Sequence, residues 1–120
     1  MASLEVKALD SPDEVREFKG KGSVNVVTVA GQTVMKGTFE PGWKWSENVK
    51  PIAGTDSCEV SHLGYVVSGQ MRVIMDDGSE SVAGPGDAMA IPPGHDAEIV
   101  GDEPCVVIDF GEFGDYAKDG

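Results

Sequence analysis

Three side chains in this sequence are of types that bind transition metals or transfer protons. The chain has two histidines, His62 and His95, and Cys58 lies four residues before the first of them. Imidazole and thiolate ligands favour Zn, Fe, Cu or Ni over Mg or Ca. Catalysis that uses a histidine as an acid or base must use one of these two imidazoles. A functional site is therefore sought first around these three residues.

The spacing of Cys58 and His62 limits how they can cooperate. On one straight strand their Cα atoms would be roughly 13 Å apart, so a shared metal requires a bulge or bend between them. Otherwise Cys58 is a small buried apolar side chain and His62 a pocket histidine bonded to a polar neighbour. His95 follows a Pro-Pro-Gly turn at residues 92–94, so its ring can face inward or hydrogen-bond the turn. The sequence leaves these alternatives open.

Two tryptophans stand close together in a polar loop expected over residues 41–57. Trp43 and Trp45 are separated by one residue, and we expect only one of them to face inward. A monomer seldom exposes two indoles in one loop, so we expect them to cover a pocket or to contact another subunit. Glu47, in the same loop, is a further candidate for binding a ligand or a metal.

Charge and composition exclude several classes of partner. The formal net charge of −12 argues against nucleic acid and anionic membranes, because phosphate binding needs clustered Lys and Arg. No apolar run approaches the roughly 18 residues that span a bilayer, and no export signal is visible. Cys58 and Cys105 are expected to be reduced thiols in a cytoplasmic protein. The sequence also lacks a phosphate-binding glycine loop, a nucleophile elbow and zinc-finger spacing.

Period-two hydrophobic patterns dominate the chain from residue 23 onward. Alternation and turn residues predict strands at residues 23–30, 32–40, 58–67, 70–75, 79–83, 88–91, 96–100 and 105–110. Ser-Pro-Asp-Glu at residues 11–14 predicts one short helix that ends by Gly20. Short strands at this spacing without crossover helices predict an all-β sandwich or closed barrel.

The expected domain organisation is a single domain over residues 1–120. Its barrel core covers about residues 23–110. Residues 1–22 form an N-terminal strand/helix extension, and residues 111–120 form an acidic tail.

Two stretches carry a family resemblance. Residues 86–94, Gly-Asp-Ala-Met-Ala-Ile-Pro-Pro-Gly, follow the pattern glycine, five residues, Pro-x-Gly. Residues 62–69, His-Leu-Gly-Tyr-Val-Val-Ser-Gly, end on a turn glycine. Together they resemble the second and first motifs of the cupin superfamily, over roughly residues 34–110. The Trp-x-Trp loop, Cys-x-x-x-His and Pro-Pro-Gly-His are similar to a group of small single-domain bacterial cupins without an assigned activity.

The resemblance implies the family's jelly-roll barrel, the double-stranded β-helix, but also a departure from its usual metal site. The glutamate position of the first motif is taken by His62. The positions of the usual histidine pair fall on residues 55 and 57, or 56 and 58, and the last histidine position falls on Ala97. The common site of three histidines and a glutamate is therefore missing from the sequence.

The same placement defines the predicted site. With His62 inward, alternation turns Cys58 and Val60 inward and Tyr65 outward. His62 is the predicted catalytic residue, and the predicted metal ligands are His62, His95 and Cys58. The remaining predicted pocket residues are Trp43, Trp45, Glu47, Val60, Met71 and Met89.

The resemblance implies a small-molecule-binding cupin barrel with its pocket centred on His62. A metal-dependent isomerase, cyclase or oxygenase that uses one Zn, Fe, Cu or Ni ion is one form of this hypothesis. The alternative is a metal-free module that senses a ligand or serves as a structural dimer. The expected partners are a small molecule and a second copy of the chain, since a homodimer covers exposed edge strands.

Overall fold

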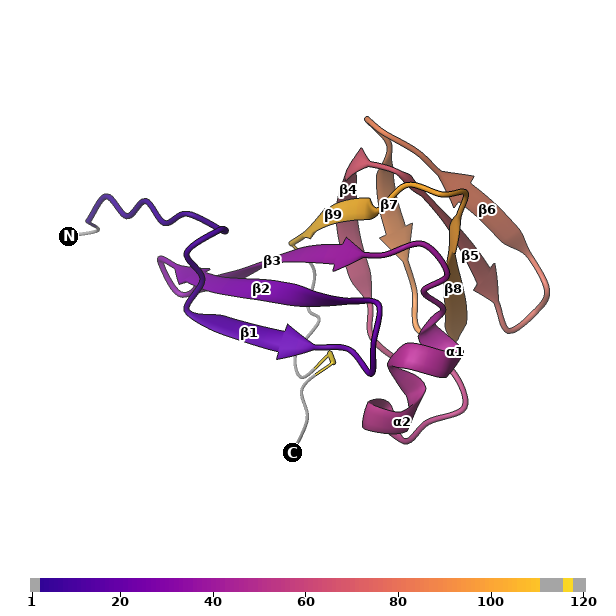
Figure 1. Ribbon diagram of the computed structural model, residues 1–120. Coiled ribbons are helices and arrows are strands. Elements are labelled where there is room, and N and C mark those ends of the chain that lie inside the picture. Colours follow the sequence, from indigo (N-terminus) through magenta and orange to yellow (C-terminus); the bar gives the residue numbers. More distant parts are fainter. Residues whose placement is uncertain (1–2, 111–115, 118–120) are drawn as a thin grey trace.

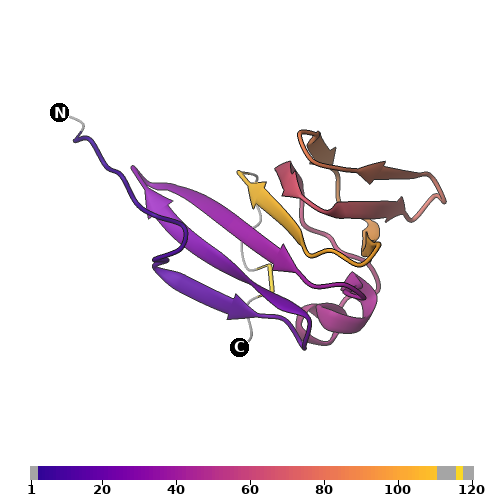
Figure 2. The same cartoon turned by 45° about the horizontal axis from the view of Figure 1, so that its top comes forward.

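The computed structural model describes residues 3–110 and 116–117, in which antiparallel strands form two sheets (Figure 1). The larger sheet has the strand order β1-β2-β3-β9-β4-β7 and the smaller one β6-β5-β8. In both views β5 and β6 lie on the opposite side of the molecule from β1 and β2 (Figures 1 and 2). The strands are β1 (Glu14–Glu17), β2 (Gly22–Val29), β3 (Gln32–Phe39), β4 (His62–Ser68), β5 (Gln70–Met75), β6 (Glu80–Ala83), β7 (Ala88–Ile91), β8 (His95–Val100) and β9 (Cys105–Asp109).

The predicted all-β jelly-roll architecture is confirmed, and the strand boundaries lie close to the predicted ones with one exception. The strand predicted over residues 58–67 begins only at His62, because residues 59–61 leave the ladder. Short helices α1 (Trp45–Asn48) and α2 (Lys50–Ala53) stand in the preceding loop. Among the described residues, no helix is long and apolar enough to span a membrane.

The position predicted for the short helix is wrong. Residues 14–17 form β1, the edge strand beside β2, and the helices lie instead at residues 45–53. An isolated helix of about ten residues is marginal in water, whereas pairing with β2 gives this segment backbone partners. The strand also points Arg16 inward, and Phe18 just beyond it is buried against Phe39, with ring centroids 5.3 Å apart.

The core lies between the sheets and extends into the tryptophan loop. Trp43 and Trp45 are each only 2 % exposed, so the prediction that only one faces inward is wrong. Residues two positions apart share a face even in a strand, and here α1 begins at Trp45 and both side chains pack into the core. The Trp43 ring packs against Phe39 with centroids 4.6 Å apart. The backbone N–H of Ile99 in β8 donates to the Trp43 carbonyl, which ties the loop to the smaller sheet.

The turn at Gly69, between β4 and β5, gives a test of this packing. Its φ is +74°, and an added Cβ would lie 2.6 Å from the Cα and 2.9 Å from the nitrogen of Cys105. Gly31 has a φ of +76° with no atom within 4 Å of an added Cβ. We expect Gly31→Ala to lower the free energy of unfolding by about 1 kcal/mol and Gly69→Ala by about 2–4 kcal/mol. Urea denaturation measures both, and equal losses would contradict this packing.

Candidate metal centre

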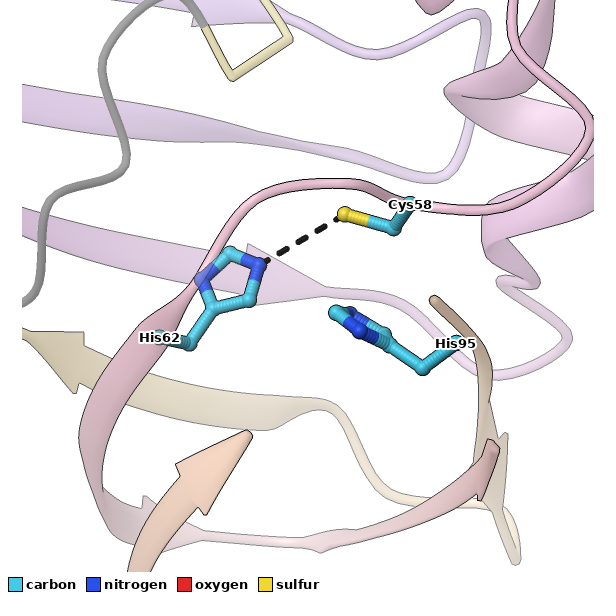
Figure 3. Close-up of side chains that lie close together, drawn as sticks. All are labelled: Cys58, His62 and His95. Carbon is cyan, nitrogen blue, oxygen red and sulfur yellow. Dashed lines mark hydrogen bonds between the residues drawn. The ribbon is translucent and has the colours of Figure 1, made fainter. Parts of the chain in front are cut away.

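The side chains of Cys58, His62 and His95 converge at one end of the barrel (Figure 3). One ligand atom from each lies within 4.8 Å of the other two. The Cys58 Sγ is 3.7 Å from the His62 Nε2, and the two imidazole centroids are 5.4 Å apart. The structure therefore brings together the three residues that the sequence analysis proposed as metal ligands.

A bend in the backbone closes the gap between Cys58 and His62. Cys58 forms an isolated bridge with His95 at the start of β8. Its N–H donates to the His95 carbonyl at 2.7 Å, and its own carbonyl accepts from the Gly94 N–H at 2.8 Å. The chain then turns before β4 begins at His62. The separation of roughly 13 Å expected for a straight strand therefore does not occur.

Asp109 sets the orientation of the His62 ring. Its Oδ2 lies 2.5 Å from the His62 Nδ1, and a carboxylate accepts hydrogen bonds, so Nδ1–H is the donor. The Nε2 lone pair is then left facing Cys58 and His95. Asp109 is 2 % exposed, and its Oδ1 accepts from the Leu63 N–H at 3.3 Å. Asp109 was not among the residues predicted from the sequence, although alternation along β9 places it on the inward face with Cys105 and Val107.

His95 does both things that the sequence analysis treated as alternatives. Its Nδ1–H donates to the Pro92 carbonyl at 2.9 Å, which bonds the turn. The ring is 3 % exposed and faces inward, with Nε2 left for the cluster. Burial, reinforced by the nearby His62, lowers the pKa of His95 below its usual value. The ring is therefore neutral at pH 7, as a metal-binding imidazole must be.

The Cys58 thiol is buried and protonated at neutral pH. Its side chain is 2 % exposed, and burial raises the pKa of Cys58 to about 11, with a smaller contribution from the negative charges of Glu59, Asp109 and Asp96. A thiol of this kind is inert towards oxidants and electrophiles. A metal at this site would have to displace the thiol proton. Cys58 and Cys105 are both free cysteines.

A small cavity of about 40 Å³ adjoins the cluster. Of the predicted pocket residues, Trp43, Trp45, Met71 and Met89 line it together with His62 and His95. Val60 and Cys58 line a neighbouring groove of about 270 Å³ that Trp45 also borders. Glu47 is exposed in α1 and lines neither space.

Tyr116 closes the cavity on the side of His62. Its ring is 6 % exposed and meets the His62 ring edge-on, with centroids 5.2 Å apart. The Tyr116 carbonyl accepts from the Arg16 Nη1 at 3.0 Å, which holds this residue against β1. It lies in the stretch predicted to be an acidic tail, of which residues 111–115 and 118–120 fall outside the described part of the chain. No periodic pattern in that stretch pointed to Tyr116.

The sequence matches the family model of the cupin domain over residues 51–111, just over half of the chain. The chain is a cupin. No curated protein matches it. The match covers β4 to β9 together with the bend at Cys58, and so includes all three residues of the cluster.

Solved structures of low sequence identity share this cupin's fold. A protein of unknown function from Acidithiobacillus ferrooxidans is 21 % identical with a TM-score of 0.60, over 90 % of this chain and 96 % of that one. An RmlC-like cupin from Shewanella frigidimarina is 19 % identical with a TM-score of 0.59, over 97 % and 99 %. A variant of Bacillus subtilis oxalate decarboxylase is 18 % identical with a TM-score of 0.60, over 96 % of this chain and 32 % of that one.

The cluster differs from the ligand set that the cupin resemblance implies. Ala97, at the expected position of the last histidine, is 4 % exposed and lines the cavity without a donor atom. His95, two residues earlier, supplies the imidazole from the same end of β8. Thr55 and Ser57 do not join the cluster, since the Thr55 hydroxyl bonds the Ser57 carbonyl and the Ser57 hydroxyl bonds Asp76.

The role of Asp109 leads to a test by NMR. At pH 8, long-range ¹⁵N–¹H correlation should show His62 as the Nδ1–H tautomer in the wild type. Asp109→Ala should abolish that preference and lower the free energy of unfolding by about 1–3 kcal/mol, because a buried N–H loses its acceptor. His95 is the internal control, since its Nδ1–H bonds Pro92 and should not change. An Nε2–H tautomer of His62 in the wild type would contradict the assignment.

Proposed function

We propose that this cupin binds one transition-metal ion, of Zn, Fe, Cu or Ni, through Cys58, His62 and His95 and that it binds a small molecule in the adjoining cavity. The observation that carries the proposal is the convergence of three ligand atoms within 4.8 Å of one another. Both imidazoles have Nδ1 bonded to an acceptor, so each offers an Nε2 lone pair. Carboxylate and carbonyl acceptors of this kind are the usual partners of metal-binding histidines.

The spacing of the Cys58 sulfur and the His62 nitrogen supports a tetrahedral site. With Zn–S of about 2.3 Å and Zn–N of about 2.0–2.1 Å, sulfur and nitrogen ligands lie roughly 3.6 Å apart. The Cys58 Sγ and the His62 Nε2 are 3.7 Å apart. Three protein ligands leave one coordination position for water or a substrate, which is the pattern of catalytic rather than structural zinc sites.

The charges around the cluster also support a divalent cation. A Cys58 thiolate and the Asp109 carboxylate together balance two positive charges, while both imidazoles are neutral ligands. Burying a metal ion in an otherwise apolar barrel is favourable only with such compensation. The net charge of −12 further raises the local concentration of cations.

A metal-dependent isomerase, cyclase or oxygenase is the enzymatic form of this proposal. A bound ion would supply Lewis-acid polarisation of an oxygen on the substrate. The hydrogen bond to Asp109 would keep the His62 ring in position. In the metal-free form, the His62 Nε2 would instead accept a proton, and the Asp109 carboxylate would stabilise the resulting imidazolium. The free thiols of Cys58 and Cys105 are consistent with the cytoplasm, the compartment that we propose.

Metal content tests the proposal directly. Protein purified without chelator should contain close to one transition-metal ion per chain, measured by elemental analysis. His62→Ala and Cys58→Ser should lose most of it, and Asp109→Asn should bind about 10–100-fold more weakly. Cys105→Ala is the matched control, because Cys105 is buried but lies outside the cluster. Wild-type protein that stays metal-free when offered Zn, Fe, Cu and Ni would contradict the metal site.

A second candidate is a structural dimer module, and the outer face of β4 favours it. Leu63, Tyr65 and Val67 are each about half exposed there, a contiguous apolar row of the kind found at subunit contacts. The buried tryptophans do not contribute to this surface.

Sedimentation velocity tests the dimer. The wild type should sediment as a dimer at micromolar concentration, and Tyr65→Lys should shift it to a monomer, because a charge would enter the contact. Thr28→Lys, at an exposed position of β2, is the control and should leave the dimer intact. A monomeric wild type would exclude this candidate.

A further inference from the structure

The cavity and the groove beside the candidate metal centre differ in their exposure to solvent. Each of the described residues that line the cavity of about 40 Å³ is buried or half-buried, so the cavity is enclosed. The groove of about 270 Å³ is open, since the exposed residues Ala53, Thr55 and Glu59 line it. Whatever occupies the cavity must therefore first pass a wall.

The three candidate ligands are divided between these two spaces. His62 and His95 line the cavity, whereas Cys58 lines the groove. Their side chains nevertheless point toward one another (Figure 3), with ligand atoms within 4.8 Å. The candidate metal position therefore lies at the boundary between the enclosed cavity and the open groove.

Tyr116 forms part of that boundary. Trp45 and Tyr116 are the two described residues that line both spaces. Of these two, Tyr116 contacts the cluster, because its ring meets the His62 ring edge-on with centroids 5.2 Å apart. Its backbone is held in place by Arg16, whose Nη1 donates to the Tyr116 carbonyl at 3.0 Å. The Tyr116 ring thus stands between the groove and the His62 side of the cavity.

A second groove, of about 520 Å³ and lined by residues of β6 and β7, meets the cavity at Met89 and Ile91. None of the three candidate ligands lines this groove. Ile91 is also paired with His62 in the ladder of β4 and β7, so a path there would pass a hydrogen-bonded strand. The groove at Cys58 is therefore the more direct route to the donors.

We infer that ligands reach the candidate metal centre through the groove at Cys58 and that the Tyr116 ring is the partition that limits their size. The cavity of about 40 Å³ holds about three or four water-sized groups, at roughly 10–15 Å³ each. A larger substrate would have to keep part of its body in the groove. Tyr116 is therefore a specificity-determining residue of the small-molecule site. This inference rests on the proposed site, but it does not require a bound metal.

The two cysteines provide matched probes of this entrance. Burial raises the pKa of both thiols to about 11, so both react slowly and a difference in their rates reports access. Cys105 is 0 % exposed and lines neither the cavity nor either groove. Chelator-treated protein is labelled with methyl methanethiosulfonate or with the larger benzyl methanethiosulfonate, both uncharged. Mass spectrometry of the two cysteine peptides gives each rate.

The wild type should label at Cys58 more slowly with the benzyl than with the methyl reagent. Tyr116→Ala should raise the benzyl rate at Cys58 by about tenfold or more, because labelling follows the population of the open form. The rate at Cys105 should not change. Tyr116→Phe keeps the ring and should behave like the wild type. Tyr116→Leu should give a smaller rise than Tyr116→Ala and replaces it if the alanine variant does not fold.

Four other outcomes would overturn the inference. An equal rise at Cys58 and Cys105 would show that Tyr116→Ala loosens the whole barrel. An unchanged rate at Cys58 would show that the ring blocks no path. An equal rise in Tyr116→Phe and Tyr116→Ala would assign the effect to the hydroxyl instead of the ring. A rise with Met89→Ala but not with Tyr116→Ala would place the entrance at the groove between β6 and β7.

The same labelling distinguishes this inference from the metal proposal. Selective labelling of Cys58 in Tyr116→Ala, together with a wild type that takes up no metal, would uphold the entrance and refute the metal site. Metal uptake by the wild type without selective labelling of Cys58 in Tyr116→Ala would uphold the metal site and overturn the entrance.

Discussion

The backbone bridge between Cys58 and His95 is the constraint on which the site depends. The Cys58 N–H bonds the His95 carbonyl, and the Gly94 N–H bonds the Cys58 carbonyl. These bonds hold the end of the tryptophan loop against the start of β8. Two potential ligands from segments far apart in the sequence are thereby fixed side by side. The bend that follows brings His62 to the same point, so the three donor atoms meet there.

Around this bridge, some buried polar side chains have hydrogen-bond partners and others do not. Asp109 pairs with His62, and the Pro92 carbonyl pairs with His95. Each pairing uses Nδ1 and leaves Nε2 for chemistry. In contrast, the indole N–H groups of Trp43 and Trp45 find no acceptor in the described part of the chain. Unpaired buried donors are costly.

Much of the fold could be predicted, because the pattern of a strand and the residues of a turn are visible in short stretches of sequence. Alternation gave the strands from β5 to β9 nearly residue by residue, and glycine marked turns such as the one at Gly69. The helix expected near Ser11 failed because a capping pattern is also local, whereas β1 gains its stability from pairing with β2. The cupin motifs were readable because their spacing is fixed by turns with special backbone angles.

The site was predictable in its residue types but not in its geometry. The chain has two histidines, and their ligand chemistry together with the position of His62 in the first cupin motif pointed to His62 and His95. The contact of Cys58 with His62 depends on a bend at residues 59–61, for which the sequence carries no strong turn signal. Asp109 could have been found by following alternation along β9. Tyr116 could not, because its place beside His62 depends on a tertiary contact with Arg16.

X-ray absorption spectroscopy of zinc-loaded protein tests the central claim most directly, because it reports the atoms bound to the metal. The proposed site predicts one sulfur scatterer at about 2.3 Å and two imidazole nitrogens at about 2.0–2.1 Å, with one further light atom. Cys58→Ser should remove the sulfur shell and leave the nitrogen shell. A first shell that contains only oxygen and nitrogen in the wild type would contradict a centre built from Cys58, His62 and His95.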